Sequence, residues 1–292
     1  MIFDETTLAK LNRLALVSRQ VRAGVLKGER RSLKRGSSLE FADYRSYAPG
    51  DELRRLDWNV YARLDRPFLK LFEEEEDLVV HLLLDGSRSM DWGSGEQHKF
   101  HYAQKLAAAL GAIALSGGDR LEIGLLHDRP GAHFGPARGE FNVLRMLQFL
   151  EGLTPGGEMD LEATLRAYAQ SGRRPGLAVL ISDLFFSTSL PDSLGWLQRQ
   201  GFEVIVVHLL APDEIDPPLS GDLRLVDVEN GQFQEVSVDG SLRRLYRQRL
   251  EAWQAGIFSA CRQRNVRCLG VSTAQPWDQV VLHEMRRGGV VK

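Results

Sequence analysis

From residue 78 onward, short apolar runs alternate with stretches whose apolar residues recur every three or four positions. The apolar runs predict buried strands, and they cover residues 78–84, 121–126, 177–183, 202–210 and 266–271. The periodic stretches predict helices over residues 99–115, 141–153, 161–170, 190–200, 241–264 and 277–287. Strands alternating with helices in this way are typical of an α/β fold with a doubly wound, mostly parallel sheet.

One segment of this region has a different pattern. Residues 223–238 contain two runs of alternating polarity on either side of Asn230-Gly231, a pair that favours a tight hairpin turn. We therefore expect a β-hairpin inserted at about residues 223–238 of a domain that spans residues 78–292.

The N-terminal region predicts a separate arrangement. Residues 6–25 carry leucines and valines at helical spacing and predict a helix. Residues 26–77 combine dense charge and turn signals with too many large apolar side chains for a disordered tail. We expect residues 1–77 to form a helix and an irregular, β-containing subdomain that packs on the core.

Composition narrows the class of protein. The 292 residues carry a formal net charge of -2, which excludes a globally basic nucleic-acid binder. No apolar run reaches the roughly 18–20 residues that a membrane helix needs, and the first residues are too acidic for a signal peptide. We therefore expect a cytoplasmic protein. Cys261 and Cys268 are too few to form a disulfide scaffold.

Oxygen-bearing side chains follow two of the predicted strands. Asp85, Ser87 and Ser89 come after the first strand, and Ser182 and Asp183 end a later one. Ligands of an open parallel sheet bind beyond the carboxyl ends of its strands, so Asp85 and Asp183 should reach one ion. A donor set made only of oxygens favours a hard cation such as Mg²⁺, and a carboxylate of a partner would complete its coordination shell.

These residues carry a resemblance to known proteins. Asp85-x-Ser87-x-Ser89, followed later by Ser182-Asp183, resembles the metal-ion-dependent adhesion site of von Willebrand factor type A domains. An upstream block resembles the bacterial "domain of unknown function 58" family, and it consists of Gly36–Phe41, Arg45–Asp51, Arg55–Trp58, Ala62-Arg63 and Glu73–Glu76. The resemblance spans roughly residues 30–275 and implies a von Willebrand factor type A or Rossmann-like sheet, with Asp85, Ser87, Ser89 and Asp183 as metal ligands.

The chain departs from this pattern at one position. The adhesion site of the resembling family also uses a threonine, and Met159 stands at that place in the stretch Gly156–Leu161. A thioether is a poor ligand for Mg²⁺. Glu158 or Thr154 is then the additional ligand, or the site is weakened.

The resemblance implies a non-catalytic, metal-dependent protein-interaction or adaptor module, without catalytic residues. It also implies a link to MoxR-type AAA+ ATPases in protein remodelling or assembly. Two alternatives stay open: a metal-assisted phosphohydrolase that uses the same acidic site, and a nucleic-acid-binding protein that uses the basic residues 27–35. The sequence predicts neither the partner-binding residues nor the client.

Overall fold

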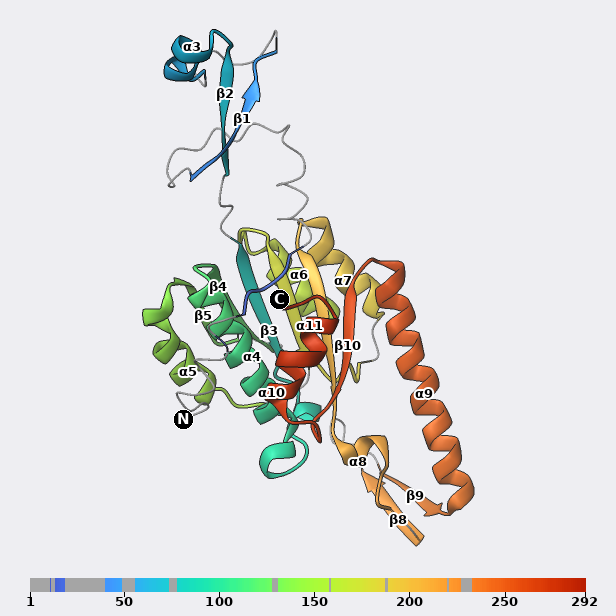
Figure 1. Ribbon diagram of the computed structural model, residues 1–292. Coiled ribbons are helices and arrows are strands. Elements are labelled where there is room, and N and C mark those ends of the chain that lie inside the picture. The colour runs from blue at the N-terminus through green and yellow to red at the C-terminus, as the bar shows by residue number, and fades with distance from the viewer. Residues whose placement is uncertain are drawn as a thin grey trace. The chain divides into compact units, whose positions relative to one another are not determined.

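A computed structural model describes most of the chain (Figure 1). The described residues are 11, 14–18, 40–48, 56–73, 78–127, 131–157, 159–186, 189–219, 221–226 and 233–292. The chain divides into two compact units, of which the larger contains residues 1–18 together with 78–292 and the smaller contains residues 19–77.

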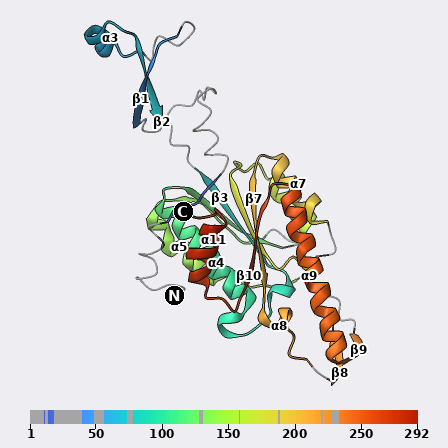
Figure 2. The same ribbon diagram turned by 45° about the vertical axis from the view of Figure 1, so that its right-hand side comes forward.

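The larger unit is built on one six-stranded sheet with the strand order β10-β7-β6-β3-β4-β5 (Figure 2). Its strands are β3 (Val79–Asp85), β4 (Arg120–Leu126), β5 (His133–Arg138), β6 (Leu177–Ser182), β7 (Glu203–Leu210) and β10 (Arg267–Ser272). Neighbouring strands run parallel except β5, which is antiparallel to β4. Every residue of β3 and β6 is buried, as a central parallel strand covered on both faces requires. The predicted α/β fold with a mostly parallel sheet is thus confirmed.

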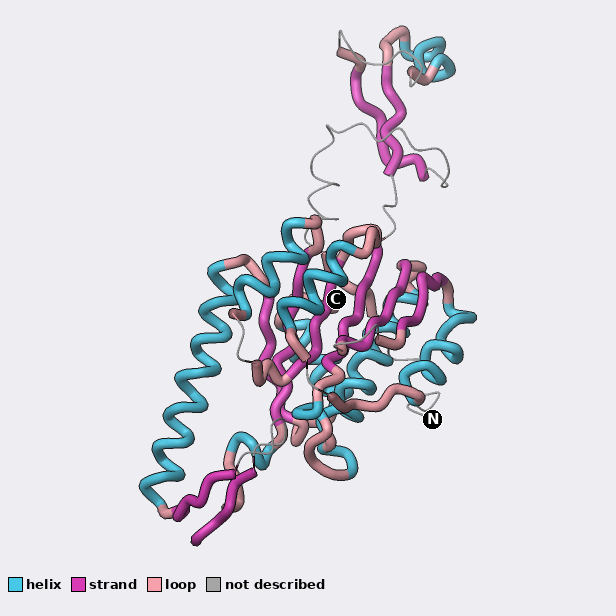
Figure 3. The backbone as a smooth tube through the Cα atoms, turned by 180° about the vertical axis from the view of Figure 1, so that it is seen from behind, coloured by secondary structure: helices cyan, strands magenta, loops and turns pink. Residues whose placement is uncertain are grey.

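Helices cover both faces of this sheet (Figures 1 and 3). One face carries α4 (Lys99–Ser116), α5 (Val143–Glu151), α10 (Trp277–Gln279) and α11 (Met285–Arg287), and the other carries α6 (Leu161–Gln170), α7 (Leu190–Arg199) and α9 (Gly240–Gln263). Helix α4 is buried on nearly all sides, because its alanines and leucines leave no polar face. A side chain at Gly111 would collide with the sulfur of Met146, so glycine permits the close packing of α4 on α5.

The hairpin predicted at residues 223–238 is formed by β8 (Gly221–Val226) and β9 (Phe233–Val238), which pair antiparallel. Residues 227–232, which include Asn230-Gly231, lie outside the described residues. The short helix α8 (Pro212–Ile215) precedes the hairpin, and both lie beyond the carboxyl end of β7 (Figure 1). No helix in the described part of the chain has the length and apolar character that a membrane crossing requires.

The helix predicted over residues 6–25 is wrong at residues 14–18. There the chain is extended, and Leu16 forms an antiparallel bridge with Val291. Val17 N donates to the carbonyl of Val290 at 2.9 Å, and Lys292 N donates to the carbonyl of Ala15 at 2.9 Å. Pairing with the C-terminal residues therefore overrides the local helical spacing.

Two further differences from the prediction concern strand β5 and the C-terminal helix. Strand β5 was not predicted, because His133–Arg138 has no apolar run; Pro136 is tolerated there since β5 is an edge strand. The helix predicted over residues 277–287 is a succession of α10, a π-helical turn at Val280–Glu284 and α11.

In the smaller unit, β1 (Glu40–Ser46) pairs antiparallel with β2 (Phe68–Glu73), and α3 (Trp58–Leu64) lies between them in sequence. Asp57 caps α3 by accepting hydrogen bonds from Asn59 N and Val60 N, and Tyr44 Oη donates to the same carboxylate at 2.9 Å. The predicted β-containing character of this region is confirmed for the described residues. The packing of this region on the core stays a prediction.

The central strand should dominate the stability of the larger unit. Leu82 is fully buried in β3, so Leu82→Ala should lower the free energy of unfolding by about 3 kcal/mol, because it leaves a cavity. Leu144→Ala is the matched control: its side chain is 59% exposed on α5, and its loss should cost less than about 0.5 kcal/mol. Urea denaturation measures both values, and equal losses would contradict this arrangement.

Candidate functional site

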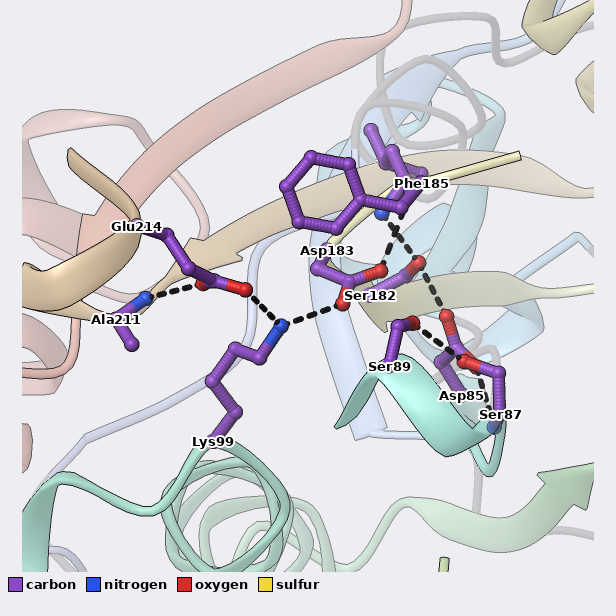
Figure 4. Close-up of polar contacts among 10 residues, drawn as sticks. Asp85, Ser87, Ser89, Lys99, Ser182, Asp183, Phe185, Ala211 and Glu214 are labelled. Carbon is purple, nitrogen blue, oxygen red and sulfur yellow. Dashed lines mark hydrogen bonds and ion pairs between the residues drawn. The ribbon is translucent and has the colours of Figure 1, made fainter. Parts of the chain in front are cut away.

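The carboxyl ends of the neighbouring strands β3 and β6 meet in a buried hydrogen bond. Asp85 ends β3, Ser182 ends β6, and both residues are fully buried. The hydroxyl of Ser182 donates to Asp85 Oδ2 at 2.6 Å and accepts from Leu184 N at 2.9 Å (Figure 4). The two strand ends that the sequence singles out are therefore in direct contact.

The loop after β3 is wound tightly around the Asp85 carboxylate. Ser87 N donates to Asp85 Oδ1 at 2.8 Å, and the hydroxyls of Ser87 and Ser89 are 3.0 Å apart. A Cβ atom on Gly86 would lie 2.7 Å from His127 Nε2 and 2.9 Å from the carbonyl oxygen of Leu126. Glycine at this position thus allows the loop to lie against the end of β4.

The loop that should carry the additional ligand lies beside the Asp85 loop. Gly156 N donates to the carbonyl of Gly86 at 2.8 Å, and Arg88 N donates to the carbonyl of Gly157 at 2.9 Å. Gly157 has a φ of 93°, which favours glycine and lets the chain turn here. The loop that contains Gly156 and Gly157 is therefore hydrogen-bonded directly to the Asp85 loop.

The three residues considered for that ligand have different positions. Met159 is half-buried and packs against the hydrophobic cluster beneath α6 and α7, so its side chain serves the core. Thr154 is exposed. Glu158 lies outside the described residues. Metal ligation by Thr154 or Glu158 stays a prediction.

Asp183, the second predicted carboxylate, is paired with a lysine. Lys99 Nζ lies 2.6 Å from Asp183 Oδ2 and 2.6 Å from Glu214 Oε1, and the side chains of Lys99 and Asp183 are fully buried. Asp183 Oδ1 accepts from Phe185 N at 3.2 Å, and Glu214 Oε2 accepts from Ala211 N at 2.8 Å (Figure 4). The site therefore contains a second group of charges, built from β6, α4 and α8.

Lys99 and Glu214 were not predicted as site residues. The signal for Lys99 was a lysine at the first position of a helix whose later turns are almost entirely apolar. The signal for Glu214 was its place three residues after Ala211, where a glutamate commonly binds back to the first N–H of a helix. Neither signal reveals that the two side chains meet.

Burial sets the electrostatics of the site. Desolvation raises the pKa of Asp85 to about 6, and the negative charge of Asp183 is the second cause of this rise. The hydrogen bonds from Ser182 and Ser87 act in the opposite direction and lower the pKa. Desolvation also raises the pKa of Glu214, although Lys99 opposes the shift. Burial lowers the pKa of His208 to about 4, so its imidazole is neutral at pH 7.

The turn that follows Asp183 is strained. Leu184 has a φ of 59°, a left-handed conformation that costs a residue with a side chain about 1 kcal/mol or more. Two hydrogen bonds hold the turn, from Leu184 N to Ser182 Oγ and from Phe186 N to the carbonyl of Leu184, both at 2.9 Å. Strain of this kind is concentrated at functional positions, which supports a role for this strand end.

The residues around Asp85 fit a small divalent ion. The hydroxyls of Ser87 and Ser89 are hydrogen-bonded to each other at 3.0 Å, which is also about the separation of ligands that lie about 2.1 Å from Mg²⁺ in adjacent octahedral positions. No lysine or arginine in the described residues forms an ion pair with Asp85, so none of them balances its charge. Asp183 fits less well as a direct ligand because Lys99 already neutralises it. In the same residues no three His, Cys, Asp or Glu side chains cluster.

The raised pKa of Asp85 predicts how stability depends on pH. The folded state holds the proton more tightly than the unfolded state, so this group's contribution falls as pH rises from about 4 to 6 and stays low above 6. In a chelating buffer, the stability of the wild type relative to Asp85→Asn should therefore fall by about 2 kcal/mol between pH 4.5 and 7.5. Urea denaturation at both pH values tests this expectation, and a constant difference would contradict it.

Sequence relatives extend along almost the whole chain. An uncharacterized protein of Mycobacterium bovis is 30% identical over 99% of this chain and 93% of its own length. An uncharacterized protein of Mycobacterium tuberculosis has the same identity and coverage.

Among solved structures, an aerotolerance-related membrane protein from Bacteroides fragilis is 15% identical and covers 72% of this chain and 99% of its own, with a TM-score of 0.42. The manganese-loaded TRAP protein of Plasmodium vivax is 15% identical and covers 45% of this chain and 57% of its own, with a TM-score of 0.34.

The model of the protein family of unknown function DUF58 matches residues 43–255. This match spans both units and includes the strand ends that carry Asp85 and Asp183, and the chain therefore belongs to the DUF58 family.

Proposed function

We propose that this DUF58 protein is a non-catalytic protein-interaction module whose binding end is the site at the carboxyl ends of β3 and β6. One observation carries the proposal: the buried carboxylate of Asp85 has no cationic partner in the described residues and lies in one loop with two hydroxyls at ligand spacing. A bound cation would balance the charge of this carboxylate, and the same cation would bind an oxygen of the partner.

In this proposal Asp85, Ser87 and Ser89 would hold Mg²⁺, and bound Mg²⁺ offers an open coordination position to an anionic oxygen of a partner. Asp183, which is paired with Lys99, would contribute through a water molecule and not as a direct ligand. The chain's own part is to keep the donors in place before binding. Ser182 Oγ and Ser87 N fix both oxygens of Asp85, so little conformational freedom is lost when the ion and the partner arrive.

The partner class comes from the resemblance that the DUF58 match supports. We propose that the module acts with a MoxR-type AAA+ ATPase, in the cytoplasm, in the remodelling or assembly of other proteins. A carboxylate of the ATPase or of its client would reach the ion. The alternative that rests on the basic residues 27–35 stays a prediction, because that stretch lies outside the described residues.

A metal-assisted phosphohydrolase would use the same acidic site, and the pKa of about 6 at Asp85 would suit an acid–base group. Each oxygen of that carboxylate accepts one hydrogen bond, from Ser87 N or from Ser182 Oγ, and these bonds hold the carboxylate in one orientation, as a fixed metal ligand requires. A screen with generic phosphoesters separates the two functions. Robust turnover that is lost in Asp183→Ala would favour the enzyme.

The ion can be tested by calorimetric titration with Mg²⁺. Asp85→Ala should lose at least about tenfold in affinity, because it removes the carboxylate of the site that has no lysine beside it in the described residues. Asp91→Ala is the matched control: this exposed aspartate, paired with His98, lies near the site but outside the donor set, and its loss should leave the titration unchanged. Equal titrations of wild type and Asp85→Ala would exclude the proposed ion site.

The partner can be tested by co-purification with a MoxR-type ATPase in the presence and absence of a chelator. Complex formation should require Mg²⁺ and should be lost in Asp85→Ala. Retention of the complex in the chelator would show that binding does not depend on the ion.

A further inference from the structure

Lys99 is a charged side chain without any exposed surface at the centre of the site. Its ammonium lies 2.6 Å from one oxygen of Asp183 and 2.6 Å from one oxygen of Glu214. On a further side it faces the ring of Phe185, whose centroid is 5.3 Å away. Phe185 stacks on Trp253 at 5.0 Å, and these aromatic rings help to exclude water from the ammonium.

An ion pair of this kind is a poor device for stability alone. Removing a lysine and a carboxylate from water costs about as much as their attraction returns, and well-packed apolar residues of the same volume serve a core equally well. Here two carboxylates share one lysine, so the ammonium can balance only one of their two negative charges. The arrangement of this group is that of a cation site with an ammonium in place of a metal ion.

We propose that Lys99 is a built-in cation, which withholds Asp183 and Glu214 from divalent ions and leaves only the Asp85, Ser87 and Ser89 side open to them. The inference deepens the proposed function, since it concerns the same site, and it names the residue that sets the strength of ion binding. With one free carboxylate, the site holds divalent ions weakly. The number of charged ligands is the main variable that tunes such affinities.

The geometry indicates what would replace the ammonium. Oxygen ligands lie about 2.3–2.6 Å from Ca²⁺ and about 2.0–2.1 Å from Mg²⁺. The two carboxylate oxygens are 2.6 Å from Lys99 Nζ, so Ca²⁺ requires the smaller movement of Asp183 and Glu214. Removal of the lysine should therefore create a site that favours Ca²⁺.

The test is a titration of metal-free protein with Ca²⁺ and with Mg²⁺, followed by calorimetry and by thermal unfolding. Lys99→Ala removes the ammonium and leaves space for an ion, and it should bind Ca²⁺ at least about tenfold more tightly than the wild type. Added Ca²⁺ should also raise its unfolding temperature more than that of the wild type, because the ion binds only the folded state. Lys105→Ala is the matched control, since Lys105 lies on the same helix but pairs with Glu96; it should behave as the wild type.

A second variant keeps the test decisive if Lys99→Ala does not fold. Lys99→Gln retains a hydrogen-bond donor but no charge, and the same gain in Ca²⁺ affinity is expected from it. The double variant Lys99→Ala/Glu214→Gln locates the ion: the gain should disappear, and a gain that persists would place the ion elsewhere and overturn the inference.

The outcomes separate this inference from the proposed function. Ion binding by the wild type without any gain in the Lys99 variants would overturn the role of Lys99 and leave the proposed ion site intact. Binding by the Lys99 variants but not by the wild type would support the role of Lys99 and remove the ion from the proposed function. Binding by none of them would overturn both.

Discussion

The hydrogen bond between Ser182 Oγ and Asp85 Oδ2 connects the ends of two central strands and buries a carboxylate between them. Strand ends in a parallel sheet leave backbone groups that loops and helix starts must satisfy. Here the loop after β3 binds back to the same carboxylate through Ser87 N, and the turn after β6 binds back to the same hydroxyl through Leu184 N. The positions of Ser87, Ser89 and Asp183 all depend on this one contact.

Two groups of charged and polar side chains lie at these strand ends, and they differ in whether a cationic side chain of the protein balances the carboxylate. The Asp85 system consists of a carboxylate and hydroxyls, and its charge is not balanced by any lysine or arginine in the described chain. The Asp183 system contains its own cation. A negative charge at Asp183 raises the pKa of Asp85, so the ammonium of Lys99 also tempers the repulsion between the two carboxylates. Lys99 thereby lowers the electrostatic cost of placing Asp85 close to Asp183 when no metal ion is bound.

The sequence predicted the sheet well because buried parallel strands are apolar throughout, and β3 and β6 show this pattern without interruption. It predicted Asp85 and Ser182 because the carboxyl ends of such strands meet by topology. It could not predict the contact of Lys99 with Glu214, since these residues are 115 positions apart and each has a plausible local role in its own helix. The helix over residues 6–25 failed for the same reason: the pairing partner of Leu16 is Val291, at the other end of the chain.

The division of the chain has a mechanical consequence. Residues 1–18 belong with residues 78–292, so the smaller unit is an insertion held by two connections and not a tail held by one. One of these connections enters the larger unit at Leu78 and continues directly as β3, whose last residue is Asp85. A force transmitted through this connection therefore reaches β3, the strand that ends in the site. Because β3 is hydrogen-bonded to β4 and β6 on its two edges, the backbone hydrogen bonds of both neighbouring strands oppose its displacement and hold Asp85 in place.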